Sequence, residues 1–324
     1  MVTATRSLGR TDLKITPIGL GCMQFAGAGL VARLFYPPLE QPAVTEIVDA
    51  ALRAGTGWFD TAEMYGRGRS ERALTTALRD LGVAPGQVPI ATKWTPGLRT
   101  AGSIVRTIDD RLAALQGHPI ALHQIHLPYG SFSSLTAQLT AMARLAHEHK
   151  ITAIGVSNFS ARQLELAHAV LARHDLVLAS NQVQISLLHR DVERNGVLDL
   201  ARRLGITLIA YSPLRSGLLT GRFHDQQARS GLLPFRRLAG GFDERTLRRT
   251  APLIEELITI GRAHGASPSQ VALAWLITFY GETVVAIPGA SKPSQATQAA
   301  EAMSLDLSAD ELSRLDQLSR SAAA

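Results

Sequence analysis

Short apolar runs alternate with stretches of helical spacing along almost the whole chain. Most of the runs are apolar at successive positions, which is typical of parallel strands covered on both faces. Between them, apolar residues recur every three or four positions, which predicts amphipathic helices. The predicted strands are residues 15–20, 58–59, 90–93, 122–126, 151–156, 178–183, 206–211 and 284–287. The predicted helices are residues 46–53, 70–81, 103–115, 135–149, 163–171, 197–204, 245–264 and 269–280, one from about 294, and 308–318.

The strand–helix unit recurs about eight times, and two architectures suit this pattern: an open doubly wound sheet and a closed (β/α)8 TIM barrel. The number and spacing of the units favour the α/β barrel. No change of composition marks a second domain, so residues 1–324 are expected to form one domain. Residues 5–16 predict an N-terminal β-hairpin ahead of the barrel. Ser308 and Glu311 form a capping-box pattern, which predicts an extra C-terminal helix.

Composition and charge narrow the class of protein. The chain carries a net charge of +6, only 5% of its residues are aromatic, and its arginines are scattered or paired. This pattern gives little support to nucleic-acid binding, and the positive charge serves solubility or attracts an anionic ligand. The single cysteine, Cys22, excludes an intramolecular disulfide. Because neither an apolar leader nor a run of ~20 apolar residues is found, we expect a soluble cytoplasmic protein without a membrane partner. The oligomeric state stays open.

Polar or aromatic side chains follow nearly every predicted strand. In α/β barrels the working face lies where the parallel strands end. The residues at these ends are Met23, Asp60, Lys93, His126, Ser157, Asn158, Gln182, Tyr211, Ser212, Pro288 and Gly289. Structure alone is a poor explanation for so many polar strand ends, and we therefore interpret this set as the active site. The long glycine-bearing loop from Leu214 to Phe242 suits a lid over it.

Asp60, Tyr65, Lys93 and His126 suit the donation of a proton. A tyrosine has a pKa of about 10. An ammonium group ~4 Å away would stabilise the phenolate by roughly 4 kcal/mol at an effective dielectric near 20, which would bring the pKa of Tyr65 to about 7. Lys93 is the candidate cation, and Asp60 is its partner. His126 would hydrogen-bond a substrate carbonyl and orient it.

Each of these four residues also has a purely structural interpretation. Asp60 alone suits a strand-end cap, Lys93 a solvated rim charge, Tyr65 a packed loop aromatic, and His126 a satisfied core histidine. Their location on three consecutive strand ends favours the joint catalytic interpretation. Neither an activated serine or cysteine nucleophile nor a metal-ligand set accompanies them in the sequence, so we expect no metal site.

Seven short motifs, in register from about residue 5 to 320, together resemble the aldo-keto reductases. They are Trp58-Phe59-Asp60-Thr61-Ala62 with Tyr65-Gly66, Ala91-Thr92-Lys93, Gln124-Ile125-His126, Gly155-Val156-Ser157-Asn158-Phe159, Asn181-Gln182-Val183-Gln184, Ala210-Tyr211-Ser212-Pro213-Leu214 and Ile287-Pro288-Gly289-Ala290. The segments 65–71 and 216–221 resemble the bacterial and plant branch, which also includes the potassium-channel β-subunits. Each motif alone is weak, but their common order is specific.

The resemblance implies NAD(P)H-dependent reduction of an aldehyde or ketone to an alcohol. Tyr65 would be the general acid, Lys93 and Asp60 would tune it, and His126 would orient the carbonyl. The cofactor contacts that it implies are Gly21, Met23, Asp60, Ser157, Asn158, Gln182, Tyr211, Ser212, Pro213, Leu214, Ser216, Gly217, Leu218, Ile287, Pro288, Gly289, Ser291, Lys292, Gln295 and Gln298. Among them, Tyr211 would stack on the nicotinamide ring. The backbone of Ser212 to Leu218 would close over the pyrophosphate, and Gly289 to Gln298 would meet the adenosine end. The substrate contacts would be Met23, Phe25, Tyr65, Trp94, His126 and Tyr129.

The chain departs from the family pattern at three places. Tyr129 stands after Pro128 where many relatives have an acid, which alters the substrate rim. Gln295 lies where many relatives have an arginine near the 2′-phosphate of NADP. Gln298-Ala299 replaces a Glu-Asn pair, so the adenine contact through that asparagine is lost. Ser291 and Lys292 would still bind a 2′-phosphate, and NADP(H) is therefore preferred, with NAD(H) as the alternative.

Two other functions compete with the carbonyl reductase. The channel-associated relatives suggest a regulatory subunit that binds the nicotinamide cofactor with little turnover, although the sequence shows no separate interaction tail. A barrel hydrolase that uses Asp60 and His126 would act without nucleotide. It gives no reason for Ser157, Gln182 and Tyr211 at the strand ends. The expected partner of the reductase is a small carbonyl compound.

Overall fold

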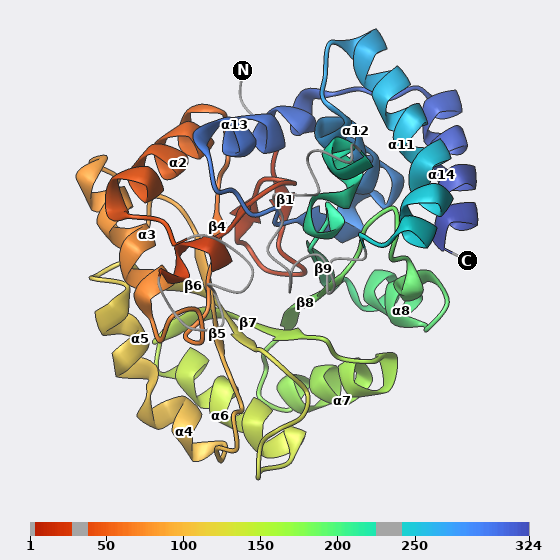
Figure 1. Ribbon diagram of the computed structural model, residues 1–324. Helices are drawn as coiled ribbons and strands as arrows, with labels where there is room; N and C mark the ends of the chain where they lie inside the picture. The colour runs from red at the N-terminus through yellow and green to blue at the C-terminus, as the bar shows by residue number, and fades with distance from the viewer. Residues whose placement is uncertain (1–3, 28–37, 225–241, 324) are drawn as a thin grey trace.

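Eight parallel strands form the centre of the molecule. The computed structural model describes residues 4–27, 38–224 and 242–323. The strands lie in the order β3-β4-β5-β6-β7-β8-β9-β10 across the sheet (Figure 1). Their bounds are Leu20–Gly21, Phe59–Asp60, Ile90–Trp94, Ile120–Ile125, Ile151–Ser157, Leu178–Gln184, Thr207–Tyr211 and Val284–Ala286. The backbone around β3 also pairs with the last strand, since Gly19 N donates to Ala286 O at 2.9 Å and Gly21 N to Pro288 O at 3.0 Å. The sheet therefore closes, which confirms the predicted barrel over an open sheet.

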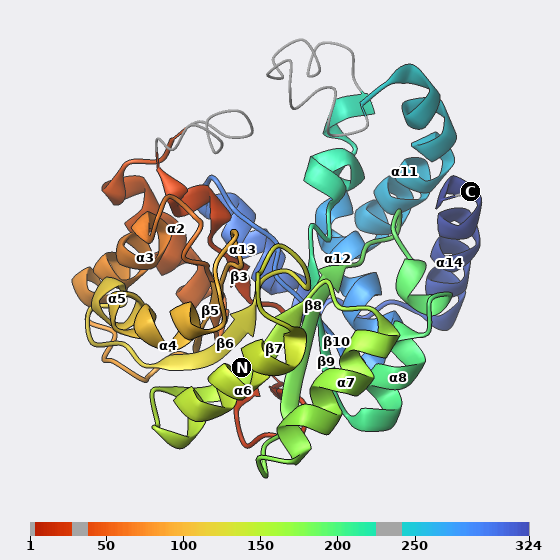
Figure 2. The same ribbon diagram turned by 90° about the horizontal axis from the view of Figure 1, so that it is seen from below.

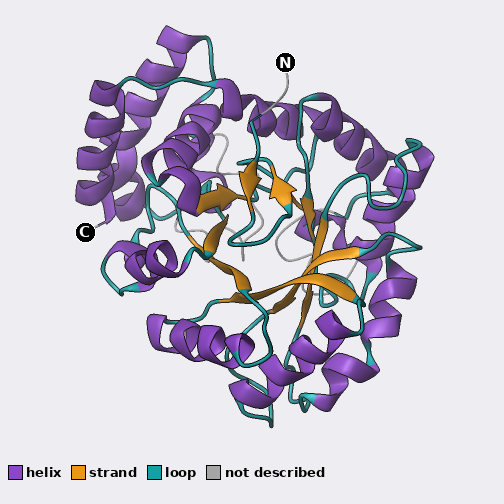
Figure 3. Ribbon diagram, turned by 180° about the vertical axis from the view of Figure 1, so that it is seen from behind, coloured by secondary structure: helices purple, strands orange, loops and turns teal. Residues whose placement is uncertain are grey.

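Helices surround this barrel (Figures 2 and 3). The α-helices are α2 (Gln41–Arg53), α3 (Arg69–Asp80), α4 (Gly102–Arg106), α5 (Ile108–Ala114), α6 (Leu135–His147), α7 (Ala161–Ala172), α8 (Val197–Leu204), α11 (Glu244–His264), α12 (Pro268–Phe279), α13 (Pro293–Glu301) and α14 (Ala309–Ala323). Short 3-10 helices are η1 (Met23–Ala26), η2 (Asp191–Glu193), η3 (Arg215–Thr220), η4 (Arg222–His224), η5 (Gly281–Thr283) and η6 (Ala302–Ser304). Within the described ranges, no helix combines the length and apolarity that a bilayer span requires.

Two predicted elements differ from the structure. Residues 103–115 form two helices, α4 and α5, which meet at Thr107, whose φ/ψ of −104°/7° lies outside the helical region. The predicted strand over residues 15–20 is wrong as one element, because Ile15 pairs in the hairpin and only Leu20 enters the sheet strand β3. Pro17, which lies between them, has no N–H to donate to a ladder.

The N-terminal hairpin covers one end of the barrel. Strand β1 (Arg6–Ser7) pairs antiparallel with β2 (Lys14–Ile15), as predicted. Leu8 and Ile15 pack with apolar residues from inside the barrel strands, such as Leu122 and Ile209. Gly9 has φ +58°, and a Cβ there would lie 2.4 Å from Ala179 O, so only glycine lets the hairpin approach so closely. The hairpin thus closes the end opposite the polar strand ends.

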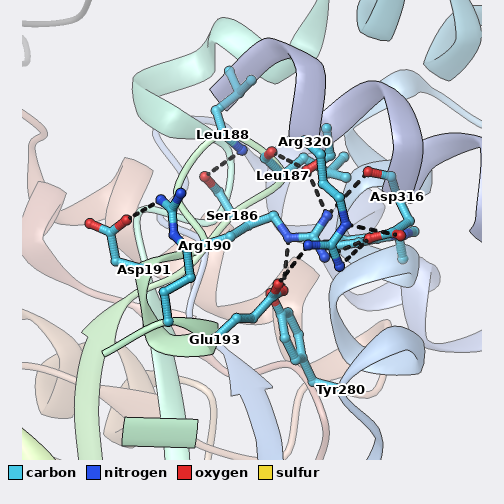
Figure 4. Close-up of polar contacts among 12 residues, drawn as sticks. Ser186, Leu187, Leu188, Arg190, Asp191, Glu193, Tyr280, Asp316 and Arg320 are labelled. Carbon is cyan, nitrogen blue, oxygen red and sulfur yellow. Dashed lines mark hydrogen bonds and ion pairs between the residues drawn. The ribbon is translucent and has the colours of Figure 1, made fainter. Parts of the chain in front are cut away.

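Helix α14 is fastened to the loop after β8 by Arg190 (Figure 4). The Arg190 guanidinium donates to Glu193 Oε1 at 2.8 Å and to Asp316 Oδ1 at 2.6 Å. It also lies 5.1 Å and 5.0 Å from the ring centroids of Trp275 and Phe279 on α12. A buried guanidinium with two carboxylate partners and aromatic neighbours holds the chain rigidly. The predicted capping box is confirmed, because Ser308 N donates to Glu311 Oε2 at 2.8 Å and Glu311 N donates to Ser308 Oγ at 3.3 Å.

Candidate active site

A buried ion pair forms the base of the site. Asp60 ends β4, Lys93 lies on β5, and their side chains are 2% and 0% exposed. The Lys93 ammonium donates to Asp60 Oδ1 and, at 2.8 Å, to Thr61 O. The other carboxylate oxygen of Asp60 accepts from Gln182 Nε2 at 2.9 Å and Gln124 Nε2 at 3.1 Å. Three side-chain donors therefore hold Asp60 in place, which leaves it poorly suited to act as a free base.

Tyr65 returns over this ion pair on the loop after β4. Tyr65 N donates to Ala62 O at 3.0 Å, and Ser70 N donates to Tyr65 O at 3.2 Å. The Lys93 ammonium lies 5.1 Å from the centroid of the Tyr65 ring. The Tyr65 and His126 rings meet edge to face, with centroids 5.9 Å apart and an interplanar angle of 82°. The structure therefore brings the four residues predicted from the strand ends into one cluster.

The predicted pKa of about 7 for Tyr65 is wrong for this structure. Burial raises the pKa of Tyr65 above its usual value of about 10, and the attraction of Lys93 offsets only part of that effect. Burial lowers the pKa of Lys93, but Asp60 and Tyr65 together outweigh it, so this pKa is raised. Desolvation of the phenolate outweighs the attraction of the nearby cation, which alone would lower the pKa of Tyr65. Tyr65 is thus a protonated phenol beside an ammonium at neutral pH.

His126 is a neutral imidazole. Its backbone N donates to Trp94 O at 2.9 Å, and its Nδ1 lies 3.3 Å from Thr95 Oγ1. Burial first, and then the charge of Lys93, lower the pKa of His126 to about 3. A neutral imidazole has one N–H donor and one bare nitrogen. His126 is therefore suited to orient a carbonyl oxygen by a hydrogen bond, and the phenol is left as the proton donor.

His123, three residues before His126 and on β6, predicts a pH-dependent stability. It is 1% exposed, and within the described chain neither ring nitrogen has a hydrogen-bond partner. Burial, followed by repulsion from Arg111, lowers the pKa of His123 to about 3. Between pH 6.5 and 3 the unfolded chain binds this proton and the folded chain does not, so stability falls as the pH falls. From pH 7 to 5 this histidine should cost about 2 kcal/mol, at 1.36 kcal/mol per unit below 6.5.

The matched variant for that prediction is His123→Leu. Urea unfolding at pH 7 and pH 5 should show that the variant loses about 2 kcal/mol less stability than the natural chain over this interval. His147→Leu, at an exposed position on α6, is the control and should leave the difference unchanged. Equal losses in the natural chain and the His123 variant would contradict the assignment of this proton to His123.

A second hydrogen-bonded row continues from the cluster across β7, β8 and β9. Tyr211 OH donates to Asn158 Oδ1 at 3.0 Å, and Asn158 Nδ2 donates to Ser157 Oγ at 3.0 Å. Ser157 Oγ in turn donates to Gln182 O at 2.9 Å. The Gln182 amide points to Asp60 rather than along this row. The structure thus brings together four of the predicted cofactor contacts, Ser157, Asn158, Gln182 and Tyr211. Gln182 also hydrogen-bonds Asp60 of the ion pair.

The backbone after β9 makes a turn with several left-handed residues. Ser212, Arg215, Ser216 and Gly217 have φ of +49°, +49°, +54° and +97°. A nest of backbone N–H groups that favours anions can form in such turns. Arg215 N donates to Ser212 O at 2.9 Å and Gly217 N to Leu214 O at 3.0 Å, so these two N–H groups are bonded within the turn. The contact of segment 212–218 with a pyrophosphate therefore stays a prediction. Pro213 is buried, Leu214 packs partly buried against the core, and Leu218 is 1% exposed. Of the predicted lid, residues 225–241 lie outside the described residues.

The predicted adenosine end lies where the last strand leaves the barrel. Ser291 N and Oγ donate to Gln295 Oε1 at 2.8 Å and 3.1 Å, at the start of α13. Lys292 is exposed beside them. Gln298 is turned toward Ser267, with their oxygens 3.5 Å apart. Lys292 is thus the cation that the described chain places at this position. The side-chain oxygen of Gln295 already accepts hydrogen bonds from Ser291.

Gln24 is a candidate ligand contact that was not predicted from the sequence. Gly21 pairs with Gly289 across the barrel closure, and a Cβ on Gly289 would lie 2.2 Å from Gln24 Nε2. Gln24 Oε1 is buried and has no hydrogen-bond partner in the described chain. An unsatisfied buried acceptor next to the predicted contacts Ile287 to Gly289 suits a ligand donor group. Its position directly after Met23 was the available signal.

The predicted substrate wall divides into exposed and buried residues. Met23 and Tyr129 are 38% and 67% exposed, whereas Phe25 and Trp94 are 2% and 1% exposed. Trp94 Nε1 donates to Ser103 Oγ at 3.0 Å, so this ring packs toward α4. Leu98 and Phe132, which were not among the predicted substrate contacts, are 70% and 74% exposed. Their loops pair through Leu98 N to Gly130 O at 2.7 Å and Phe132 N to Arg99 O at 3.0 Å.

Comparisons with known proteins decide the family. A model of the aldo/keto reductase family matches residues 17–320. The chain belongs to the aldo/keto reductase family. An oxidoreductase of Mycobacterium tuberculosis, described as uncharacterised, is 36% identical over 95% of this chain and 90% of the relative. A chloroplastic pyridoxal reductase of Arabidopsis thaliana is 30% identical over 86% of this chain and 76% of its own length.

A solved structure supports the same family. The crystal structure of a thermostable aldo-keto reductase in complex with the inhibitor epalrestat has a TM-score of 0.76. It is 30% identical and covers 98% of this chain and 100% of its own. The resemblance inferred from the seven motifs is confirmed, as is the TIM-barrel fold. The family supports an oxidoreductase that acts on carbonyl groups.

Proposed function

We propose that this aldo/keto reductase reduces an aldehyde or ketone to an alcohol with a nicotinamide cofactor, and that Tyr65 donates the proton. The convergence of Tyr65, Lys93 and His126 at the open end of the barrel carries the proposal. The bound cofactor supplies a hydride to the carbonyl carbon. The carbonyl oxygen then gains negative charge, and the Tyr65 hydroxyl protonates it. His126 orients that oxygen by a hydrogen bond.

The surroundings of Tyr65 account for its role in this step. After proton transfer Tyr65 is a phenolate, and the ammonium of Lys93 stabilises that negative charge in a poorly solvated site. Asp60 holds Lys93 in place, and its carboxylate compensates the positive charge of the ammonium. A raised pKa keeps the phenol protonated at neutral pH, which is the form that reduction requires. The Tyr65 hydroxyl thus carries its proton before the carbonyl oxygen of the substrate becomes basic.

The described residues fit a nicotinamide dinucleotide. Ser157 and Asn158 offer polar groups for a carboxamide, and Tyr211 presents an aromatic ring beside them. The left-handed turn at Ser212 to Gly217 suits a pyrophosphate. The buried, unsatisfied Gln24 Oε1 suits a ligand hydroxyl or amide. NADP(H) is the preferred form in this proposal, since Lys292 is exposed where a 2′-phosphate is expected.

Lys292→Ala should test the preference for NADPH. An exposed lysine contributes as a point charge, so its loss should weaken NADPH binding by about tenfold or less and leave NADH binding almost unchanged. Quenching of tryptophan fluorescence on titration with each cofactor gives the two dissociation constants. Lys14→Ala, in the hairpin at the opposite end of the barrel, is the charge-matched control. Equal weakening of both cofactors would count against a phosphate contact at Lys292.

The whole proposal is tested by mixing the purified protein with NADPH and a panel of aldehydes and ketones. The panel includes pyridoxal, because a relative is named a pyridoxal reductase. Loss of the absorbance of reduced cofactor that depends on the carbonyl compound supports the proposal, and epalrestat is a competitor to include. Tight NADPH binding without turnover on any carbonyl would overturn it and favour the regulatory subunit.

A further inference from the structure

The imidazole of His126 faces a hydroxyl that the proposed step does not use. Thr95 follows β5 directly, and its Oγ1 lies 3.3 Å from His126 Nδ1. No other hydrogen bond of Thr95 Oγ1 is found in the described chain. Catalytic hydrogen bonds are often long in proteins without ligand, so this distance is compatible with a working contact. Thr95 is thus placed to act on the side of the ring away from a substrate.

The tautomer of His126 decides whether the imidazole can donate a hydrogen bond to the carbonyl oxygen of a substrate. A carbonyl oxygen only accepts hydrogen bonds, and a neutral imidazole carries a single N–H. If Nε2 carries the hydrogen and faces the substrate, Nδ1 is bare and accepts. A threonine hydroxyl donates one hydrogen, so Thr95 satisfies this bare nitrogen. The hydrogen bond at one ring nitrogen sets the chemistry of the other.

Thr95 is itself held by Glu63, which lies two residues before Tyr65. Thr95 N donates to Glu63 Oε1 at 2.6 Å. Arg99 also donates to that oxygen, and Arg111 Nη1 lies 3.5 Å from Glu63 Oε2. The Glu63 side chain is 10% exposed, so two cations compensate a nearly buried carboxylate. One side chain therefore joins the loop of the proton donor to the residue beside His126.

We propose that Thr95, anchored by Glu63, is a positioning residue that donates to His126 Nδ1 and so keeps the hydrogen on Nε2, toward the substrate. The inference rests on the proposed carbonyl reduction for its effect on rate, whereas the tautomer itself is independent of turnover. It assigns a function to Glu63 as the common support of Tyr65 and His126. Neither residue touches substrate or cofactor in this assignment.

The kinetic test compares Thr95→Val with Thr95→Ser. Valine has nearly the shape of threonine without the hydroxyl, and should lower kcat/KM for an aldehyde by about tenfold, the worth of one hydrogen bond of ~1.4 kcal/mol. Serine keeps the hydroxyl and should restore most of the rate. The dissociation constant for NADPH should stay the same in both. Thr259→Val on α11, where the hydroxyl bonds only its own helix, is the control.

The second readout is the ¹⁵N spectrum of the imidazoles, with the His126 signals assigned by their loss in His126→Gln. The natural chain and Thr95→Ser should show the Nε2–H form, and Thr95→Val should move toward the other tautomer. Thr95→Ala replaces Thr95→Val if the latter fails to fold. Equal rates and equal spectra in all variants of an active enzyme would overturn the inference. A natural chain without turnover would refute the proposed function, and the spectra would still decide the tautomer.

Discussion

Tyr65→Phe should lower kcat for carbonyl reduction by about 10²–10⁴-fold, the usual contribution of a positioned general acid. The variant keeps the ring that packs edge to face on His126 and removes only the hydroxyl. The oxygen that gains charge must then take its proton from water. Affinity for NADPH should change little, because the phenol is needed for the transition state rather than for cofactor binding. Single-turnover oxidation of bound NADPH measures the step directly.

The control for this variant is Tyr280→Phe, which removes another enclosed phenol hydroxyl. Tyr280 OH donates to Glu193 in the Arg190 cluster, which contains none of the four site residues (Figure 4). Its replacement should reduce stability and leave kcat unchanged. A decrease of less than tenfold for Tyr65→Phe, with cofactor affinity intact, would reject Tyr65 as the proton donor. An equal decrease for both variants would point to a general effect of lost hydroxyls.

The sequence predicted the site because a barrel brings strand ends together. Asp60, Lys93 and His126 are 66 residues apart at most, yet parallel pairing of β4, β5 and β6 makes them neighbours. The period of two along a strand also explains where Trp94 lies. Lys93 is buried against Asp60, and the adjacent Trp94 points to the other face of the strand, toward Ser103 on α4.

Other features had no clear signal in the sequence. The pKa of Tyr65 depends on how much surrounding protein excludes water, and strand spacing does not report that exclusion. Glu63 and Thr95 are ordinary loop residues until two loops 32 positions apart meet. The family resemblance implied a cofactor contact for Gln182, and only the packed structure shows that its amide turns to Asp60. What the sequence leaves open is the direction and environment of side chains rather than their place in the fold.

Breaking the Asp60–Lys93 pair should give the largest loss of stability. Lys93→Met leaves a buried carboxylate with two amide donors. Asp60→Asn leaves a buried ammonium that has lost its carboxylate and keeps only uncharged acceptors, such as Thr61 O. Removing one partner of a buried pair typically costs about 3–5 kcal/mol, since the other charge stays in a poorly solvated site. Urea unfolding followed by tryptophan fluorescence measures the loss in each variant.

The double variant separates stability from catalysis. With Asp60→Asn and Lys93→Met together, no uncompensated charge is left from this pair, so stability should recover to within about 1–2 kcal/mol of the natural chain. Activity should not recover, because the phenolate of Tyr65 still lacks its ammonium partner. Recovery of both stability and activity would mean that Lys93 contributes to stability and not to catalysis. Additive losses of stability would mean that the two charges do not compensate each other, against the geometry of the site.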